Sequence, residues 1–157
     1  GVPELSGPKI PVKLDKPEII LHKVKVLDKE FEITCVSMGN PHCVVYVNDV
    51  KNFEVEKYGT VLENHELFPK RANVEFVQII SKSEVIQRTW ERGSGETWAC
   101  GTGASAVCVA GVLTGKTGNK IQNHLTGGDL VLEWEGRGKN LFMTGPAVEI
   151  FSGIAEE

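Results

Sequence analysis

Cys100 is the residue best placed for chemistry in this chain, because it lies where a glycine-rich turn leads into an apolar run. Gly101, Thr102 and Gly103 follow it, and the small and branched apolar residues of Ala104–Leu113 predict a helix buried on every side. The first amides of such a helix lack intrahelical partners and carry the positive end of the dipole. A thiolate or a substrate carboxylate would be stabilised there. We therefore expect the pKa of Cys100 to be lowered, which would give a reactive base or nucleophile.

A buried structural cysteine is the alternative, since free cysteine is among the most buried residue types. The glycines around Cys100 and the upstream acid–base pair Glu91 and Arg92 favour the chemical interpretation. Glu91 ends a predicted strand that leads into the same loop, so we expect it to be the acid–base partner of Cys100. The backbone amides of Gly101 and Thr102 are expected to bind the substrate carboxylate.

Four segments of the chain resemble, in the same order, motifs of the diaminopimelate epimerase family, whose members epimerise an amino acid without a cofactor. The segments are SMGNPHCV (Ser37–Val44), RANVEFV (Arg71–Val77), ERGSGETWACGTGASA (Glu91–Ala106) and MTGPAVEIF (Met143–Phe151). The resemblance implies a protein of two pseudo-symmetric halves, each with a cysteine at the start of a central helix. Only the second half is matched here, because nothing before Cys100 resembles the first-half motif, in which a cysteine precedes Gly-Asn-Gly.

The resemblance also implies roles for residues outside the cysteine motif. His42 is expected to give acid–base support, and Asn40, Asn73 and Arg92 are expected to bind the distal amino and carboxyl groups of the substrate. An Asn amide both donates and accepts hydrogen bonds, which suits a zwitterion. The turn-forming pair Asn40 and Pro41 places His42 at the start of a strand, where a neutral imidazole could accept a thiol proton. From the residues alone, an ordinary histidine and a strand-entry cap at Asn73 remain open.

The function implied by the resemblance is the interconversion of LL- and meso-diaminopimelate, an isomerase reaction. Two thiols on opposite faces of the α-carbon would exchange its proton, with no cofactor and no metal. As a C-terminal half, the chain is expected to need an N-terminal half that supplies the second cysteine, and to be inactive alone. The resemblance also implies a homodimer and a role in lysine biosynthesis.

Three alternatives remain. The first is a related isomerase on the same scaffold, similar to proline racemases or to phenazine-biosynthesis isomerases. The second is a binding or assembly module without catalysis. The third is a hydrolase in which Cys100 is the nucleophile and His42 is the base, with the helix amides as an oxyanion hole.

The elements that must position these residues follow from apolar periodicity and turn residues. Besides the buried helix, Val50–Phe68 has helix-like spacing. The predicted strands are 18–27, 31–38, 43–47, 74–80, 84–91, 129–135, 140–144 and 148–151, of which the first two form a hairpin. The predicted class is α+β, with a curved, mostly antiparallel sheet wrapped around one central helix.

Composition predicts one compact domain preceded by a linker. The proline-rich segment Gly1–Pro17 is expected to be extended, which leaves 18–157 as the C-terminal epimerase-like domain. The 157 residues are 41% hydrophobic and 24% charged, enough for one core. A net charge of −4 without a basic stripe argues against nucleic acid as a partner, and no apolar run approaches the ~18 residues of a membrane span. Four cysteines without C-x-x-C spacing favour reduced thiols in the cytoplasm.

Overall fold

The computed structural model describes residues 1–154, which form nine strands and two helices. These are β1 (His22–Val26), β2 (Lys29–Ser37), β3 (Pro41–Tyr46), α1 (Val55–Glu63), β4 (Asn73–Ser81), β5 (Glu84–Glu91), β6 (Gly95–Thr97), α2 (Gly101–Leu113), β7 (Lys120–Leu125), β8 (Gly128–Trp134) and β9 (Leu141–Thr144). All the strands belong to one sheet in the order β1-β2-β3-β4-β5-β7-β8-β9, with β6 paired to β5.

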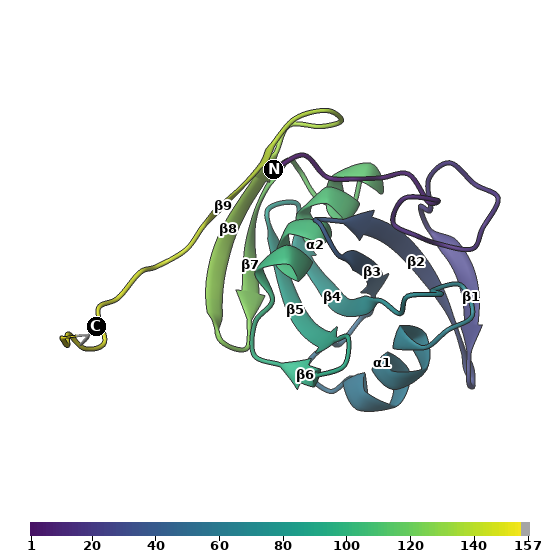
Figure 1. The fold of residues 1–157 in the computed structure, drawn as a ribbon, viewed down its shortest axis with the longest axis horizontal. Coiled ribbons are helices and arrows are strands. Elements are labelled where there is room, and N and C mark those ends of the chain that lie inside the picture. Colours follow the sequence, from purple (N-terminus) through teal and green to yellow (C-terminus); the bar gives the residue numbers. More distant parts are fainter. Residues whose placement is uncertain (155–157) are drawn as a thin grey trace.

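The sheet is mostly antiparallel and curves around α2, as the sequence predicts (Figure 1). The two parallel pairings among the described strands are β3 with β4 and β5 with β7. The predicted hairpin of β1 and β2 is also confirmed, with Val26 opposite Lys29 across a tight turn. The fold class is therefore α+β.

Two hydrophobic cores lie on the two faces of this sheet, because successive residues of a strand point to opposite sides. On β3, Val44 packs in the core around α2, whereas Val45 packs in the core that contains α1. On β4, Val77 packs in the core around α2, and Phe76 packs in the core that contains α1. The central strands are thus covered on both sides, which explains their nearly continuous apolar sequence.

Helix α2 is buried from Gly103 to Gly111, which confirms the predicted central helix. It begins at Gly101 rather than at Ala104. Its small residues let the surrounding strands approach closely. A Cβ atom at Gly103 would lie 2.5 Å from Oε1 of Glu75. The start of α2 is therefore fixed against β4.

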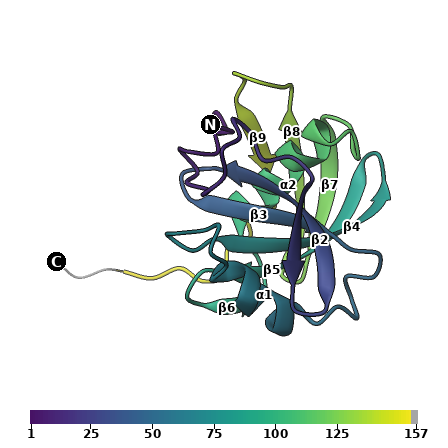
Figure 2. The same ribbon diagram turned by 90° about the vertical axis from the view of Figure 1, so that its right-hand side faces the viewer.

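The lead Gly1–Pro17 is not the extended linker that the sequence predicts. Glu4 and Ser37 exchange two backbone hydrogen bonds, which attaches the lead to the end of β2. Ile10 and Val12 are buried in the core that contains α1. In Figure 2 the lead lies against the body of the domain. Proline-rich composition excluded regular structure here, but it did not reveal that the apolar residues between the prolines are buried.

The predicted helix Val50–Phe68 is also too long, since α1 covers only Val55–Glu63. The flanking residues Val50 and Phe68 are buried, but they lie in turns. Apolar spacing therefore continued past both ends of the helix. The guanidinium of Arg88 donates hydrogen bonds to backbone carbonyls of the turn before α1, which satisfies acceptors that a longer helix would have used.

Strands β6 and β7 were not predicted. In β7, Asn123 occupies a buried position between Ile121 and Leu125, so an apolar alternation is interrupted by a polar residue. Its amide is paired inside the protein, donating a hydrogen bond to Gln87 over 2.6 Å. A buried polar pair of this kind is invisible to a search for hydrophobic periodicity.

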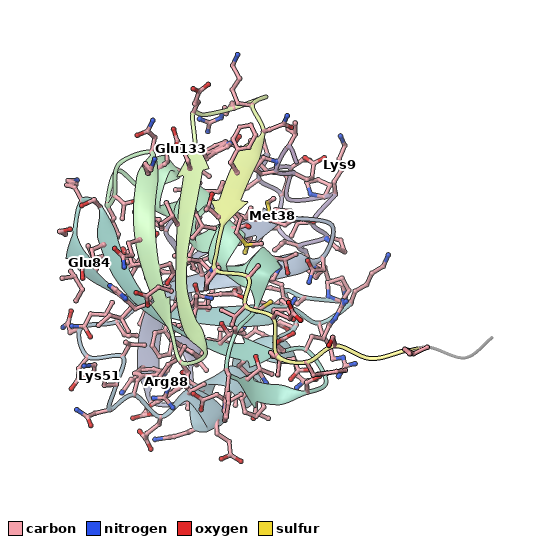
Figure 3. All side chains as sticks on the ribbon, turned by 90° about the vertical axis from the view of Figure 1, so that its left-hand side faces the viewer. Lys9, Met38, Lys51, Glu84, Arg88 and Glu133 are labelled. Atoms are coloured by element: carbon pink, nitrogen blue, oxygen red, sulfur yellow. The ribbon has the colours of Figure 1, made fainter. Side chains whose placement is uncertain are left out.

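The last predicted strand, 148–151, is absent from the described part of the chain. Residues 145–154 instead run away from β9, and Figure 3 shows this tail leaving the edge formed by β7, β8 and β9. Val148, Ile150 and Phe151 are 80%, 90% and 85% exposed. The final residues of the predicted domain, 155–157, lie outside the described residues.

The two ends of the folded part meet at β9. Gly1 and Leu141 exchange two backbone hydrogen bonds, of 3.2 Å and 2.8 Å. The lead therefore closes the open edge of the sheet at the start of this strand. Across residues 1–154, neither helix has the length and apolarity that a membrane span requires.

Candidate active site

The predicted site residues gather at one end of the central strands. The parallel strands β3 and β4 begin at Pro41 and Asn73, and the antiparallel strand β5 ends at Glu91. These three chain positions therefore lie at the same edge of the sheet, which is formed by the ends of its central strands. Helix α2 packs on β3 and β4 and begins at the same edge, because Gly103 lies against Glu75.

Asn73 joins three of the segments that carry predicted site residues. Its amide nitrogen donates a hydrogen bond of 2.9 Å to the carbonyl of Pro41, and its Oδ1 accepts one of 3.0 Å from the backbone amide of Arg92. The side chain is buried. Asn73 therefore holds the Asn40–His42 turn and the Glu91–Arg92 loop in fixed positions.

His42 is fully buried, and both of its ring nitrogens are engaged. Nδ1 lies 2.8 Å from Oε1 of Glu75, and Nε2 lies 3.0 Å from Oδ1 of Asn40. The sequence predicted a neutral imidazole with a free nitrogen that could accept a thiol proton. The geometry differs, because both ring nitrogens are within hydrogen-bond distance of an oxygen atom. The ring is instead fixed between two oxygen atoms.

Glu75 is the site residue that the sequence analysis missed. It lies on β4 with a fully buried side chain, and it contacts both His42 and the start of α2. A signal for it was present, since Glu75 is a carboxylate within the apolar run of RANVEFV. A charged residue in a strand that is covered on both faces is rarely buried without a partner.

Cys100 directly precedes α2 and is 8% exposed. Burial raises the pKa of the Cys100 thiol, and this effect outweighs the hydrogen bonds from Thr102 and from the backbone of Gly103, which lower it. An uncompensated negative charge on Glu75 or Glu91 would raise the pKa of the Cys100 thiol further. The expected lowering is therefore wrong for this chain, in which the thiol is held in its protonated form.

The remaining predicted residues surround Cys100 more loosely. Glu91 accepts a hydrogen bond of 2.6 Å from the hydroxyl of Thr97, across the β5–β6 hairpin. Arg92 donates one of 2.9 Å to the carbonyl of Lys70. Gly101 is half-buried, and Thr102 is exposed with its Oγ1 3.4 Å from Sγ of Cys100. The start of α2 is thus accessible at Thr102, whereas the guanidinium of Arg92 is bonded to the loop at Lys70.

Other features of the surface do not coincide with this site. A hollow of about 650 Å³ is lined by residues of α1 and by Arg88, and it contains none of the predicted site residues. Within residues 1–154, no group of three or more His, Cys, Asp or Glu side chains is arranged to hold a metal ion.

The fold is shared with a solved structure. A phenazine biosynthesis protein of the PhzF family from Bacillus anthracis is similar with a TM-score of 0.50 and 18% identity, over 72% of this chain and 38% of that chain. At this identity the likeness concerns the fold alone. The described chain is therefore of the same fold class as part of the PhzF-family protein.

Within this class the sequence selects one family. The diaminopimelate epimerase family model matches residues 34–150, so the chain belongs to the diaminopimelate epimerase family. Relatives with that name include proteins of Brachyspira hyodysenteriae, 56% identical over 96% of this chain, and of Agathobacter rectalis, 51% identical over 98%. The chain covers 53% and 56% of these two relatives, which is about half of their length.

Proposed function

We propose that this chain is the C-terminal half of a diaminopimelate epimerase and that Cys100 is one of its two catalytic thiols. The observation that carries the proposal is the position of Cys100 immediately before the buried helix α2, within the motif that matches the family. The gathering of Asn40, His42 and Glu91 at the same edge supports it.

The proposed reaction is a proton exchange at the α-carbon of diaminopimelate. One thiolate removes the α-proton, and a thiol on the opposite face delivers a proton to the resulting carbanion. The raised pKa of Cys100 suits the second role, because a protonated thiol is available at neutral pH. The substrate and product differ only in configuration, so no oxidant or cofactor is consumed.

Substrate binding in this proposal uses the accessible side of the site. The amides of Gly101 and Thr102 bind the α-carboxylate at the helix N-terminus, which also stabilises the carbanion formed beside it. Asn40 and Arg92 bind the distal amino and carboxyl groups. Asn73 contributes by positioning the segments that contain them, since both ends of its amide are bonded to the backbone.

The second thiol comes from an N-terminal half in the proposed enzyme. Exposed apolar side chains near Cys100 support a covering partner there. Trp98 and Met143 are 77% and 51% exposed, and a Cβ atom on Gly101 would lie 3.3 Å from Cε of Met143. The chain alone is therefore expected not to epimerise diaminopimelate.

The proposal further includes a homodimer in the cytoplasm that serves lysine biosynthesis. The family resemblance supports the dimer and the pathway, and the four unpaired thiols suit a reducing compartment. Sedimentation of the two halves together, compared with this chain alone, measures the oligomeric state.

Deuterium incorporation at the α-carbon of LL-diaminopimelate tests the proposal. This chain is mixed with a separately produced N-terminal half of a relative, and exchange from D2O is followed by mass spectrometry. The mixture is expected to exchange, whereas each half alone is not. Cys100→Ala is expected to abolish exchange, and Cys108→Ala, the same change within the same helix, is expected to retain it.

Other results would select an alternative. No exchange by halves that demonstrably associate would favour a non-catalytic module, and racemisation of proline instead would favour a related isomerase. Acyl-enzyme formation on Cys100 would indicate a hydrolase, although His42 has no ring nitrogen left unengaged to serve as its base.

A further inference from the structure

The two hydrogen bonds of the His42 ring determine its chemistry. Oε1 of Glu75 and Oδ1 of Asn40 are both acceptors, at 2.8 Å and 3.0 Å from the two ring nitrogens. A neutral imidazole carries a hydrogen on only one nitrogen, so it can satisfy one of these acceptors. With Glu75 ionised, both bonds are made only by an imidazolium, in which each nitrogen donates, whereas a neutral ring would need a protonated Glu75 that donates to Nδ1.

Glu75 supplies the counter-charge for such a ring. Its side chain is fully buried, and its second oxygen, Oε2, is buried with no hydrogen-bond partner among the described residues. An ionised carboxylate in an apolar interior is strongly destabilising unless a positive charge is paired with it. Within residues 1–154, His42 is the basic group in ion-pair contact with Glu75.

The thiols and the other carboxylate near this pair carry no positive charge. The thiol of Cys100 lies at the start of α2, the carboxylate of Glu91 ends β5, and the thiol of Cys43 is next to His42 on β3. The hydrogen bond with the thiol of Cys35, and then burial, raise the pKa of Cys43 well above its ordinary value, so it is uncharged. Arg92 lies near this corner, but its guanidinium donates to the carbonyl of Lys70, so the cation that can pair with Glu75 is His42.

We propose that Glu75 is a positioning residue that holds His42 as a doubly protonated imidazolium, bonded through Nδ1 to Glu75 and through Nε2 to Asn40. His42 then forms a charge-neutral pair with Glu75 beside the Cys100 site and is not the base that accepts the thiol proton. This deepens the proposed function, on which its catalytic meaning rests. The charges of the pair cancel, so a carbanion formed near Cys100 meets a neutral dyad and not a buried anion.

Asn40 gains a defined orientation from the same arrangement. With its Oδ1 accepting from the imidazolium, its amide nitrogen is turned away from the ring and can only donate. A substrate group that meets this amide nitrogen must then present an acceptor, such as the distal carboxylate. The ion pair thus fixes the protonation of the His42 ring and the direction in which the Asn40 amide donates.

Nitrogen NMR of the histidine rings tests this directly on the full chain. In the unaltered protein both ring nitrogens of His42 are expected to carry protons at neutral and mildly alkaline pH. His124, whose ring bonds to two carboxylates, serves as an internal reference for a titrating imidazolium. A His42 ring with a single proton at neutral pH would overturn the proposal without any variant being needed.

Glu75→Gln keeps the size of the side chain and removes its charge. In this variant His42 is expected to become a neutral ring with one proton, while the His124 signals stay unchanged. The matched control is Glu84→Gln, which should affect His124 and leave His42 doubly protonated. A His42 ring that stays doubly protonated in folded Glu75→Gln would show that Glu75 does not hold its charge.

Alkylation of Cys100 as a function of pH gives a second readout. Glu75→Gln removes the negative charge of Glu75 and, with it, the positive charge of His42. The pH midpoint of Cys100 alkylation is therefore expected to move little in this variant. If Glu75 were instead a lone anion beside the thiol, its removal would lower the midpoint by about one pH unit or more. Neither measurement uses turnover, so failure of this inference is distinguishable from failure of the proposed epimerase activity.

Discussion

The contact between Gly103 and Glu75 leaves no space for another atom. Gly103→Ala would place a methyl group 2.5 Å from Oε1 and 3.2 Å from Cδ of a fully buried carboxylate. We expect a loss of about 1–3 kcal/mol in the free energy of unfolding, because overpacking outweighs the gain in helix propensity. Urea denaturation measures this value.

Gly101→Ala is the control, since it introduces the same methyl group two residues earlier in the same helix. The nearest atom there is Cε of Met143 at 3.3 Å, at the end of a flexible side chain. Its unfolding free energy should change by much less. Equal losses in both variants would mean that the Glu75 contact is not the cause.

The sequence predicted which residues lie together at this end of the strands better than it predicted their protonation and hydrogen bonding. Cys100, His42, Asn73 and Glu91 could be selected because glycines, turn residues and motif order are local properties. The raised pKa of the Cys100 thiol could not be predicted, because it depends mainly on burial by segments that are distant in sequence. The same holds for the two backbone hydrogen bonds of the Asn73 amide.

At the level of elements, Glu63 joins the end of α1 to the loop that carries Arg92. Its carboxylate accepts hydrogen bonds from Trp90 Nε1 over 2.8 Å, from the Gly93 amide over 2.9 Å and from Arg71 over 3.0 Å. Glu63→Ala would leave the first two donors without their partner. We expect a loss of about 2–4 kcal/mol in urea denaturation. The bond to Arg71 adds little, because that side chain is 53% exposed.

Glu54→Ala serves as the control on the other side of this helix. Its carboxylate is 58% exposed and pairs with Lys57 on the surface. The unfolding free energy should therefore change by less than about 1 kcal/mol. A Glu63→Ala variant as stable as this control would show that the buried carboxylate does not fasten the loop.

His124 links β5, β7 and β8 through two carboxylates. Hydrogen bonds to Asp129 and then to Glu84 raise the pKa of His124 above its ordinary value of 6.5. A raised pKa in the folded state means that this stabilisation is complete below about pH 6.5 and is lost as the pH rises through the folded pKa. The contribution should be no more than about 1 kcal/mol, because all three groups are partly exposed.

Urea denaturation on both sides of this window checks the sign. His124→Gln should remove the part of the stability that declines with rising pH. His22→Gln should act in the opposite direction, because burial and then Lys16 lower the pKa of His22. Identical pH profiles for the two variants would contradict the assignment.

The strands and the buried helix were predictable because their apolar periodicity is local. Strand Glu84–Glu91 was predicted with its observed bounds, and α2 differed only at its start. Strand β7 was missed because Asn123 is buried against Gln87, and α1 was overextended because turn residues also enter the core. Errors thus arose where long-range packing, and not periodicity, decides burial.

For the whole molecule, the two termini differ in their importance for stability. Ending the chain after Ala147 removes a segment whose described residues, 148–154, are exposed, so the unfolding free energy should stay within about 0.5 kcal/mol. Removing residues 1–12 takes Ile10 and Val12 out of the core, each worth about 1.5–3 kcal/mol. Urea denaturation of both truncations measures the contrast, and a destabilising tail deletion would contradict it.

The pairing of Gly1 with Leu141 also constrains the order in which the protein is assembled. These residues are separated by 140 positions, so a chain emerging from the ribosome cannot close this contact until β9 has been synthesised. Contacts between such distant positions slow folding, and incomplete chains expose apolar surface and strand edges to chaperones and to aggregation. Gly1 thus reaches its final place only after the residues up to Leu141 have been synthesised.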